Sequence, residues 1–241
     1  MTQDQQSTWL ETTLGQRLMS QEQRLFDAVT GDIFGFNAVQ LGLLQIDTLK
    51  NSRIPNIIRT GNYAGDCYCE SDYLPFAPDC IDLLCLPHVL EFSENPHETL
   101  REAERVLVPE GYLIITGFNP VSTWGIKHAF NKEENYPWKG HFFTISRIKD
   151  WLALLGLEFV SGDMGVYEPP INNEKWLKRC VFMDKFGSRW WPMLGGVYFI
   201  VARKRVVNMT LLKPGWQKIP LRPRFVVSAQ KQSQKAKSPL N

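Results

Sequence analysis

Short apolar segments alternate with longer amphipathic ones over residues 31–205, and this alternation is the main pattern of the chain. The apolar segments at 36–41, 54–58, 67–70, 81–86, 112–117, 157–160 and 197–203 have the length of strands. Most of the stretches between them have helical spacing or turn residues. Strands that alternate with helices predict an α/β fold with a mostly parallel sheet, because parallel strands need crossover connections.

The clearest helix signal lies between the fourth and fifth predicted strands. Asn95 can act as the N-cap, Pro96 suits the first helical position, and Glu98 stands where a capping box has its acid. An apolar stripe then continues to residue 107. A second helix is predicted to start near Thr144 and to end at Gly156.

Three segments differ in pattern, and we interpret them as the organisation of the chain. Residues 1–30 predict an N-terminal helical cap, 31–205 the main α/β domain, and 206–241 a basic, partly disordered tail. Within the domain, the insertion at 169–192 mixes aromatic and basic residues. It suits peripheral contact with lipid or a helix packed over the sheet.

The formal net charge of +2 conceals a basic tail and an acidic body. Residues 203–241 hold ten Lys and Arg and no acids, so the first 202 residues sum to −8. The acidic body disfavours nucleic acid as a partner, although the tail could bind it or lie solvated against the body. The longest apolar runs are about half of a membrane span, and the polar start shows no signal peptide, so we expect a cytoplasmic protein.

The five cysteines form neither a disulfide framework nor a zinc motif. Their number is odd, no CxxC pair occurs, and no histidine is close to Cys67 and Cys69 in sequence. We therefore expect reduced thiols and no bound metal.

Residues 72–120 resemble the central half of the class I S-adenosylmethionine-dependent methyltransferases, and in particular the type 11 methyltransferase domain. The shared features are an acid followed by LPF, an apolar strand beginning near an Asp, the HVLEF segment, a helix ending in ERVL, and the PEGYLII strand. The resemblance implies a Rossmann-like, doubly wound sheet of seven strands with the last one antiparallel. S-adenosylmethionine would bind at the carboxyl edge of the strands, where such sheets open a crevice.

The resemblance also implies positions for the cofactor. Asp72 would accept a hydrogen bond from the adenine amino group, with Tyr73 or the next residue supplying a backbone donor to the ring. Leu86, Pro87 and His88 would border the methionine part. Two simpler interpretations stay open: a turn aspartate at position 72, and a strand-end histidine bonded to backbone at position 88.

The glycine-rich turn of the family is degenerate in this chain. The family places an acid and three glycines after the first strand, whereas residues 40–46 read QLGLLQI. Gln40 stands in for the acid, and Gly42 is the one glycine left. The side chains of Leu44 and Ile46 must point elsewhere or obstruct the methionine end.

The ribose site departs from the family as well. The family commonly ends its second strand with an acid, but here Arg59 leads to Thr60, Gly61 and Asn62. Asn62 could make part of the contact, and Asp47 is a second candidate. Losing a charge-assisted hydrogen bond costs roughly 1.5–3 kcal/mol, so we expect weakened cofactor binding.

The chemistry that the resemblance implies is methyl transfer to an acceptor, for which we expect a small molecule. A general base is needed only for some acceptors, such as a hydroxyl, and His88 and His141 are the candidates because histidine changes charge near neutral pH. One alternative is a methyltransferase-like binding or scaffold protein without activity. Another is an NADP-dependent oxidoreductase that uses Arg59, which the missing GxGxxG motif disfavours.

Overall fold

The computed structural model describes residues 3–61, 65–130, 136–171 and 192–205. The chain divides into two units, Met1–Val206 and Val207–Asn241. The second unit, most of the aromatic and basic insertion, and Asn62 lie outside the described residues. Expectations for the tail and the insertion therefore stay predictions.

The first unit is built on one seven-stranded sheet in the order β3-β2-β1-β4-β5-β7-β6. The strands are β1 (Asn37–Leu41), β2 (Asn56–Gly61), β3 (Cys67–Tyr68), β4 (Ile81–Pro87), β5 (Leu107–Phe118), β6 (Leu157–Gly165) and β7 (Val197–Lys204). Strands β1 to β5 pair in parallel, and β7 pairs antiparallel with both β5 and β6. The predicted mostly parallel sheet with an antiparallel last strand is confirmed.

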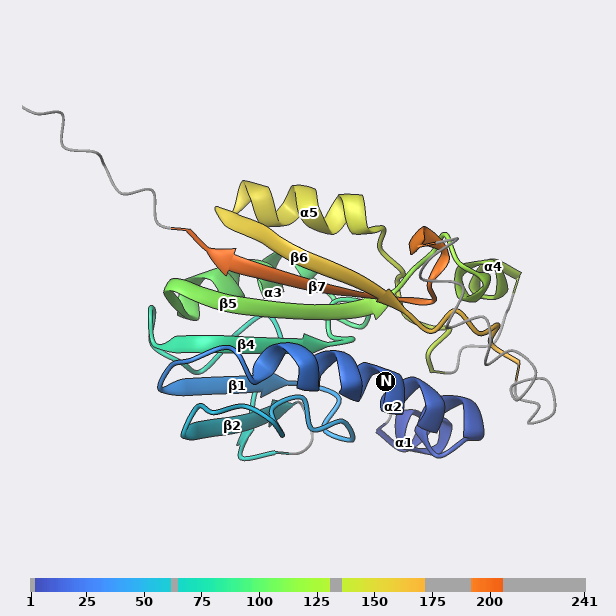
Figure 1. Cartoon of the computed structure of the whole chain (residues 1–241), viewed down its shortest axis with the longest axis horizontal. Helices are drawn as coiled ribbons and strands as arrows, with labels where there is room; N and C mark the ends of the chain where they lie inside the picture. Colours follow the sequence, from blue (N-terminus) through green and yellow to red (C-terminus); the bar gives the residue numbers. More distant parts are fainter. Residues whose placement is uncertain (1–2, 62–64, 131–135, 172–191, 206–241) are drawn as a thin grey trace, which may run out of the picture. The chain divides into compact units, whose positions relative to one another are not determined.

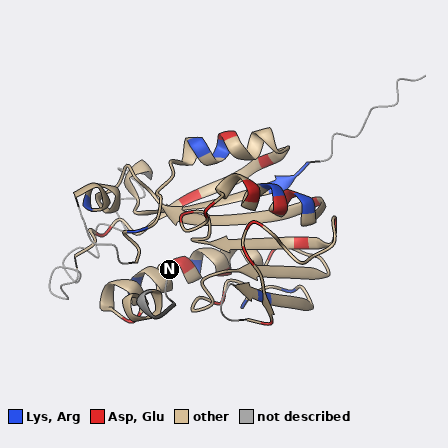
Figure 2. Ribbon diagram, turned by 180° about the vertical axis from the view of Figure 1, so that it is seen from behind, with Lys and Arg blue, Asp and Glu red and all other residues tan. Residues whose placement is uncertain are grey.

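Helices cover both faces of this sheet (Figure 1). They are α1 (Gln3–Leu10), α2 (Thr13–Thr30), α3 (Pro96–Val106), α4 (Thr123–Phe130) and α5 (Ile145–Leu154). The ring of Trp9 in α1 lies 6.2 Å from the ring of Trp124 in α4. Figure 2 shows Lys, Arg, Asp and Glu at several positions along helices on one face of the sheet, and on other elements as well. No helix in the described ranges has the length and apolar character of a membrane span.

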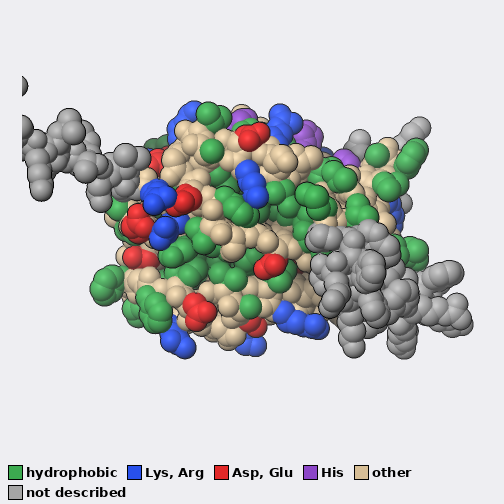
Figure 3. Space-filling view, turned by 45° about the horizontal axis from the view of Figure 1, so that its top comes forward, with side chains coloured by type: hydrophobic (Ala, Val, Ile, Leu, Met, Phe, Trp, Pro, Cys, Tyr) green, Lys and Arg blue, Asp and Glu red, His purple; other side chains and the backbone are tan. Residues whose placement is uncertain are grey.

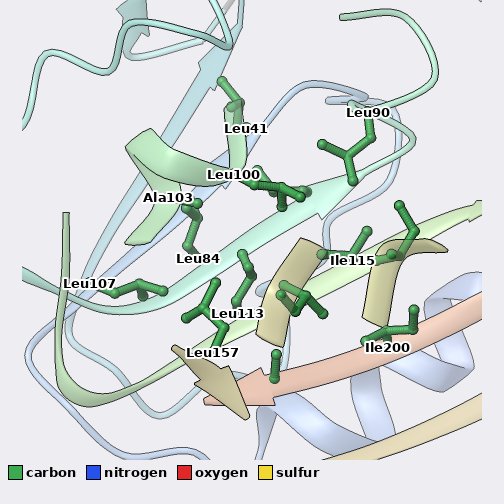
Figure 4. Close-up of a cluster of buried hydrophobic side chains, with 14 of the residues drawn as sticks. Leu41, Leu84, Leu90, Leu100, Ala103, Leu107, Leu113, Ile115, Leu157 and Ile200 are labelled. Carbon is green, nitrogen blue, oxygen red and sulfur yellow. The ribbon is translucent and has the colours of Figure 1, made fainter. Parts of the chain in front are cut away.

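The central strands are mostly apolar because both of their faces are buried. In β4, Leu84 and Leu86 point into the core under α3 and α5, which Figure 4 shows in close-up. Leu83 and Cys85, which alternate with them in sequence, point into the second core under α2. This alternation fixes the register of β4 and so the position of the loop that follows it.

Two local expectations differ from the structure. The side chain of Asn95 makes no capping hydrogen bond at the start of α3, although a cap was predicted there. The helix predicted near Thr144 is α5, and the hydroxyl of Thr144 caps it by accepting from the N–H of Arg147 at 3.3 Å. Strand β5 begins at Leu107, five residues before the predicted start, because Leu107 already pairs with Ile81 of β4.

Candidate active site

The loop that follows β1 is held from inside by Gln40. The side-chain amide donates to the carbonyl oxygens of Leu43 at 3.1 Å and Ile46 at 2.7 Å. Its oxygen accepts from the backbone N–H and the hydroxyl of Thr48, at 3.1 and 2.9 Å. A carboxylate could not donate to these carbonyls. The fully buried Gln40 therefore shapes the loop, and none of its groups is left to contact a cofactor.

Replacing Gln40 with leucine should lower the free energy of unfolding by about 2–3 kcal/mol, since it leaves the buried groups of Thr48 and two carbonyls without partners. The matched control is Gln45→Leu, because Gln45 is exposed in the same loop. Urea denaturation measures both variants. A Gln40 variant within about 0.5 kcal/mol of the control would contradict the role assigned to the amide.

The loop itself turns at Gly42 and Leu43, whose φ angles are 75° and 36°. Leu43 and Ile46 are 6% and 2% exposed and pack into the core under α2, so Ile46 points away from the strand ends, while Leu44 is half-buried. A Cβ on Gly42 would lie 3.0 Å from Cγ2 of Val89, in the loop after β4. The glycine lets the two loops approach each other where the methionine end of a cofactor is expected.

The end of β2 carries an ion pair. The guanidinium of Arg59 donates to both carboxylate oxygens of Asp47, at 2.9 and 3.0 Å. Asp47 is therefore engaged and could accept from ribose hydroxyls only by sharing with Arg59. The other ribose candidate, Asn62, is not among the described residues.

Asp72 lies in the turn beyond β3, half-buried, and its carboxylate forms no hydrogen bond or ion pair with any described residue. Tyr73 beside it is 77% exposed. The two backbone donors expected for the adenine ring are both in use: the N–H of Tyr73 donates to the carbonyl of Glu70 at 3.3 Å, and that of Leu74 to Glu102 at 3.0 Å. The turn thus presents a free carboxylate and an exposed aromatic ring.

His88 stands at the end of β4 between two carboxylates, in what we call the Glu22–His88–Glu91 cluster. Its Nε2 is 2.6 Å from Oε1 of Glu22 in α2, and its Nδ1 is 3.0 Å from Oε2 of Glu91. All three side chains are at most 1% exposed. Glu91 also accepts from the backbone N–H of Phe118 in β5. The cluster therefore joins α2, β4 and β5 at the carboxyl edge of the sheet.

The charge of this cluster determines what His88 can do. Burial lowers the pKa of His88, but the carboxylates of Glu22 and Glu91 outweigh burial and raise the pKa to about 10. At neutral pH the ring is then an imidazolium that donates to both acids. A protonated ring that is closed off from solvent cannot accept a proton from an acceptor.

Glu22 was not among the residues predicted for the site, although the sequence holds a signal for it. The buried positions of α2 include Leu14, Leu18, Glu22, Phe26 and Thr30, an unbroken i, i+4 row. An acid within an apolar row predicts a buried partner of opposite charge. Its identity as His88 follows only from the fold.

His141, the second candidate base, is exposed and lies on the other side of Glu91. Its backbone N–H donates to the carbonyl of Glu91 at 2.8 Å. Both residues line a cavity of about 520 Å³ between the loop after β4 and the start of α5. The structure thus brings both histidines to one edge of the sheet, but only His141 is open to a ligand.

The cysteines that the structure describes are free thiols. Burial raises the pKa of Cys69, and it raises that of Cys85 to about 12, so both are protonated at neutral pH. In the described part of the chain, no group of three or more His, Cys, Asp and Glu is placed to hold a metal ion.

Comparison with known sequences gives two matches of different extent. The family model described as "Methyltransferase domain" matches residues 58–115. The chain is 30% identical to the uncharacterized protein YafS of Escherichia coli over 207 residues, which is 84% of this chain and 82% of that protein.

Known structures share the fold. A S-adenosylmethionine-dependent methyltransferase of Thermotoga maritima, described as a possible histamine N-methyltransferase, is similar with a TM-score of 0.57 and 17% identity over 78% of this chain and 89% of that chain. A structure of a Haloferax volcanii complex of the Trm112 methyltransferase activator with a putative methyltransferase is similar with a TM-score of 0.55 and 14% identity, over 76% of this chain and 88% of the matched one.

Proposed function

Because the chain belongs to the class I S-adenosylmethionine-dependent methyltransferases, we propose that it transfers a methyl group to a small-molecule acceptor at the carboxyl edge of its sheet. The observation that carries this proposal is the free carboxylate of Asp72 beyond β3. Strands β3 and β4 run in the same direction, so Asp72 and the cavity beside His141 belong to the same edge.

The residues at this edge fit the adenosyl end of S-adenosylmethionine more fully than the methionine end. Asp72 would accept from the adenine amino group, and the exposed ring of Tyr73 can pack on the base. At the other end, Gly42 and the buried Leu86 and Pro87 would border the methionine part by backbone and apolar contact. Gln40 acts only through the loop, so we expect modest cofactor affinity.

When bound, the cofactor would supply an electrophilic methyl carbon on a sulfonium, so that an acceptor lone pair can bond to this carbon while the C–S bonding pair leaves with the sulfur. The protein mainly positions the reactants. For an N–H or O–H acceptor, His141 is open to the cavity and can take the released proton. His88 fixes the end of β4 through its two carboxylates.

Replacing Asp72 with alanine should raise the dissociation constant for S-adenosylmethionine by about 10–100-fold, because a hydrogen bond to a charged group contributes roughly 1.5–3 kcal/mol. Isothermal titration calorimetry of wild type and variant measures this change. The matched control is Asp163→Ala, which removes an exposed carboxylate from β6 at the opposite edge strand of the sheet.

An equal loss in both variants would show that general charge, and not Asp72, governs binding. Unchanged binding in Asp72→Ala would remove this residue from the adenine site. A wild-type chain that binds neither S-adenosylmethionine nor S-adenosylhomocysteine would refute the proposed function.

A further inference from the structure

The cavity beside His141 is rimmed by four basic side chains and walled by aromatic ones. The rim residues are His97, Lys139, His141 and Arg147, and we call the site the basic groove. In the space-filling view of Figure 3, histidine side chains lie close to Lys or Arg and to hydrophobic side chains near the upper edge of the molecule. The basic groove has a volume of about 520 Å³, which is within the range of small-molecule sites.

The wall of the basic groove is a preformed aromatic surface. Phe143 and Trp151 are 9% and 8% exposed, so their rings are fixed by packing in the core under α3 and α5. The guanidinium of Arg147 lies 5.8 Å above the first ring and 5.2 Å above the second. The ring of His97 is 4.1 Å from that of Trp151. A planar ligand would meet the exposed edges of these two rings together with the exposed side chains of Arg147 and His97 that lie over them.

The two lasting cations of the basic groove, Lys139 and Arg147, are not paired with the acids of its lining. Lys139 and Arg147 form no ion pair with a carboxylate anywhere in the described ranges. Of the two acids in the lining, Glu91 is bonded to His88 and to the N–H of Phe118, which leaves Glu94 alone. The start of α3, without a side-chain cap, adds its positive end to the same groove.

We propose that the basic groove binds the methyl acceptor, and that this acceptor is an aromatic compound carrying an oxyanion, a carboxylate or a phosphate. Arg147 and Lys139 would bind the oxyanion, while the exposed ring of His97 and the exposed edges of Phe143 and Trp151 contact the aromatic ring. The lining includes none of the residues expected to hold the cofactor. The assignment as acceptor rests on the proposed function, whereas binding of the oxyanion does not.

The test is a calorimetric titration of the full chain with 2-naphthoate, 2-naphthyl phosphate and the neutral 2-naphthamide. We expect at least one of the two anions to bind about tenfold or more tightly than the amide, and the stronger of them identifies the headgroup. Arg147→Gln should weaken binding of that anion by about tenfold or more. The control is Lys149→Gln, on the same helix, because Lys149 lies over the ring of Phe159, which does not line the groove.

A second titration, in saturating S-adenosylhomocysteine, separates this inference from the proposed function. Binding of the anion that is undiminished by S-adenosylhomocysteine supports two separate sites, and competition between them overturns the acceptor assignment. Equal affinity for amide and anions, or an equal effect of both substitutions, overturns recognition of the oxyanion. A chain that binds S-adenosylhomocysteine but none of the naphthyl compounds refutes the groove proposal and leaves methyl transfer standing.

Discussion

Replacing His88 with leucine should lower the free energy of unfolding by about 3–5 kcal/mol, the usual cost of breaking a buried ion pair. The substitution leaves the carboxylates of Glu22 and Glu91 facing a leucine with no cation between them, at most 1% exposed. Oε2 of Glu22 already lacks a hydrogen-bond partner in the described structure, so the cluster has no spare donor to compensate. Urea denaturation at neutral pH measures the loss.

Two further variants separate loss of charge pairing from loss of packing. His141→Leu changes an exposed histidine on the same edge and should stay within about 0.5 kcal/mol of wild type. The double variant Glu22→Leu, His88→Leu should be more stable than His88→Leu alone, because it removes one of the two buried carboxylates that His88→Leu leaves without a cation. If His88→Leu costs under about 1 kcal/mol, the cluster does not carry the buried charges assigned to it.

Much of the fold could be predicted because its signals are local. The segments that become β1, β4 and β7 are mostly apolar, as is typical of strands buried on both faces, and α5 begins directly after Thr144, near the predicted start. Errors arose where pairing overrides local signals. Leu107 follows a helix directly, yet pairing with Ile81 makes it the first residue of β5.

The site was predicted less completely because its contacts are distant in sequence. Glu22 and His88 are 66 residues apart in sequence, and no neighbouring residue of either one predicts their contact. The commitment of Gln40 to its own loop depends on the turn at Gly42 and Leu43, which sequence patterns do not specify. Asp72 could be proposed for the cofactor site because a compact motif surrounds it, whereas the basic groove joins residues 91–97 with residues 139–151, which are distant in sequence.

Stability at alkaline pH should depend on the same histidine. In the unfolded chain the pKa of His88 is near its ordinary value of 6.5, and in the folded chain its two carboxylates raise it to about 10. Below pH 6.5 His88 is protonated in both the folded and the unfolded chain, and the cluster contributes its full stabilisation. As the pH rises from 6.5 toward 10, His88 releases its proton in the unfolded chain and keeps it in the folded chain. The free energy of unfolding therefore falls by about 1.4 kcal/mol per pH unit.

Between about pH 7 and pH 10, wild type should therefore lose about 3 kcal/mol more stability than His88→Gln, which keeps a donor but cannot titrate. The subtraction is needed because burial also raises the pKa of Cys85, Tyr136 and Tyr198, which lowers stability at high pH in both proteins. Denaturation in urea at several pH values measures the difference. Parallel curves for the two proteins would mean that His88 is not a buried imidazolium, and the reason for excluding it as the base would no longer hold.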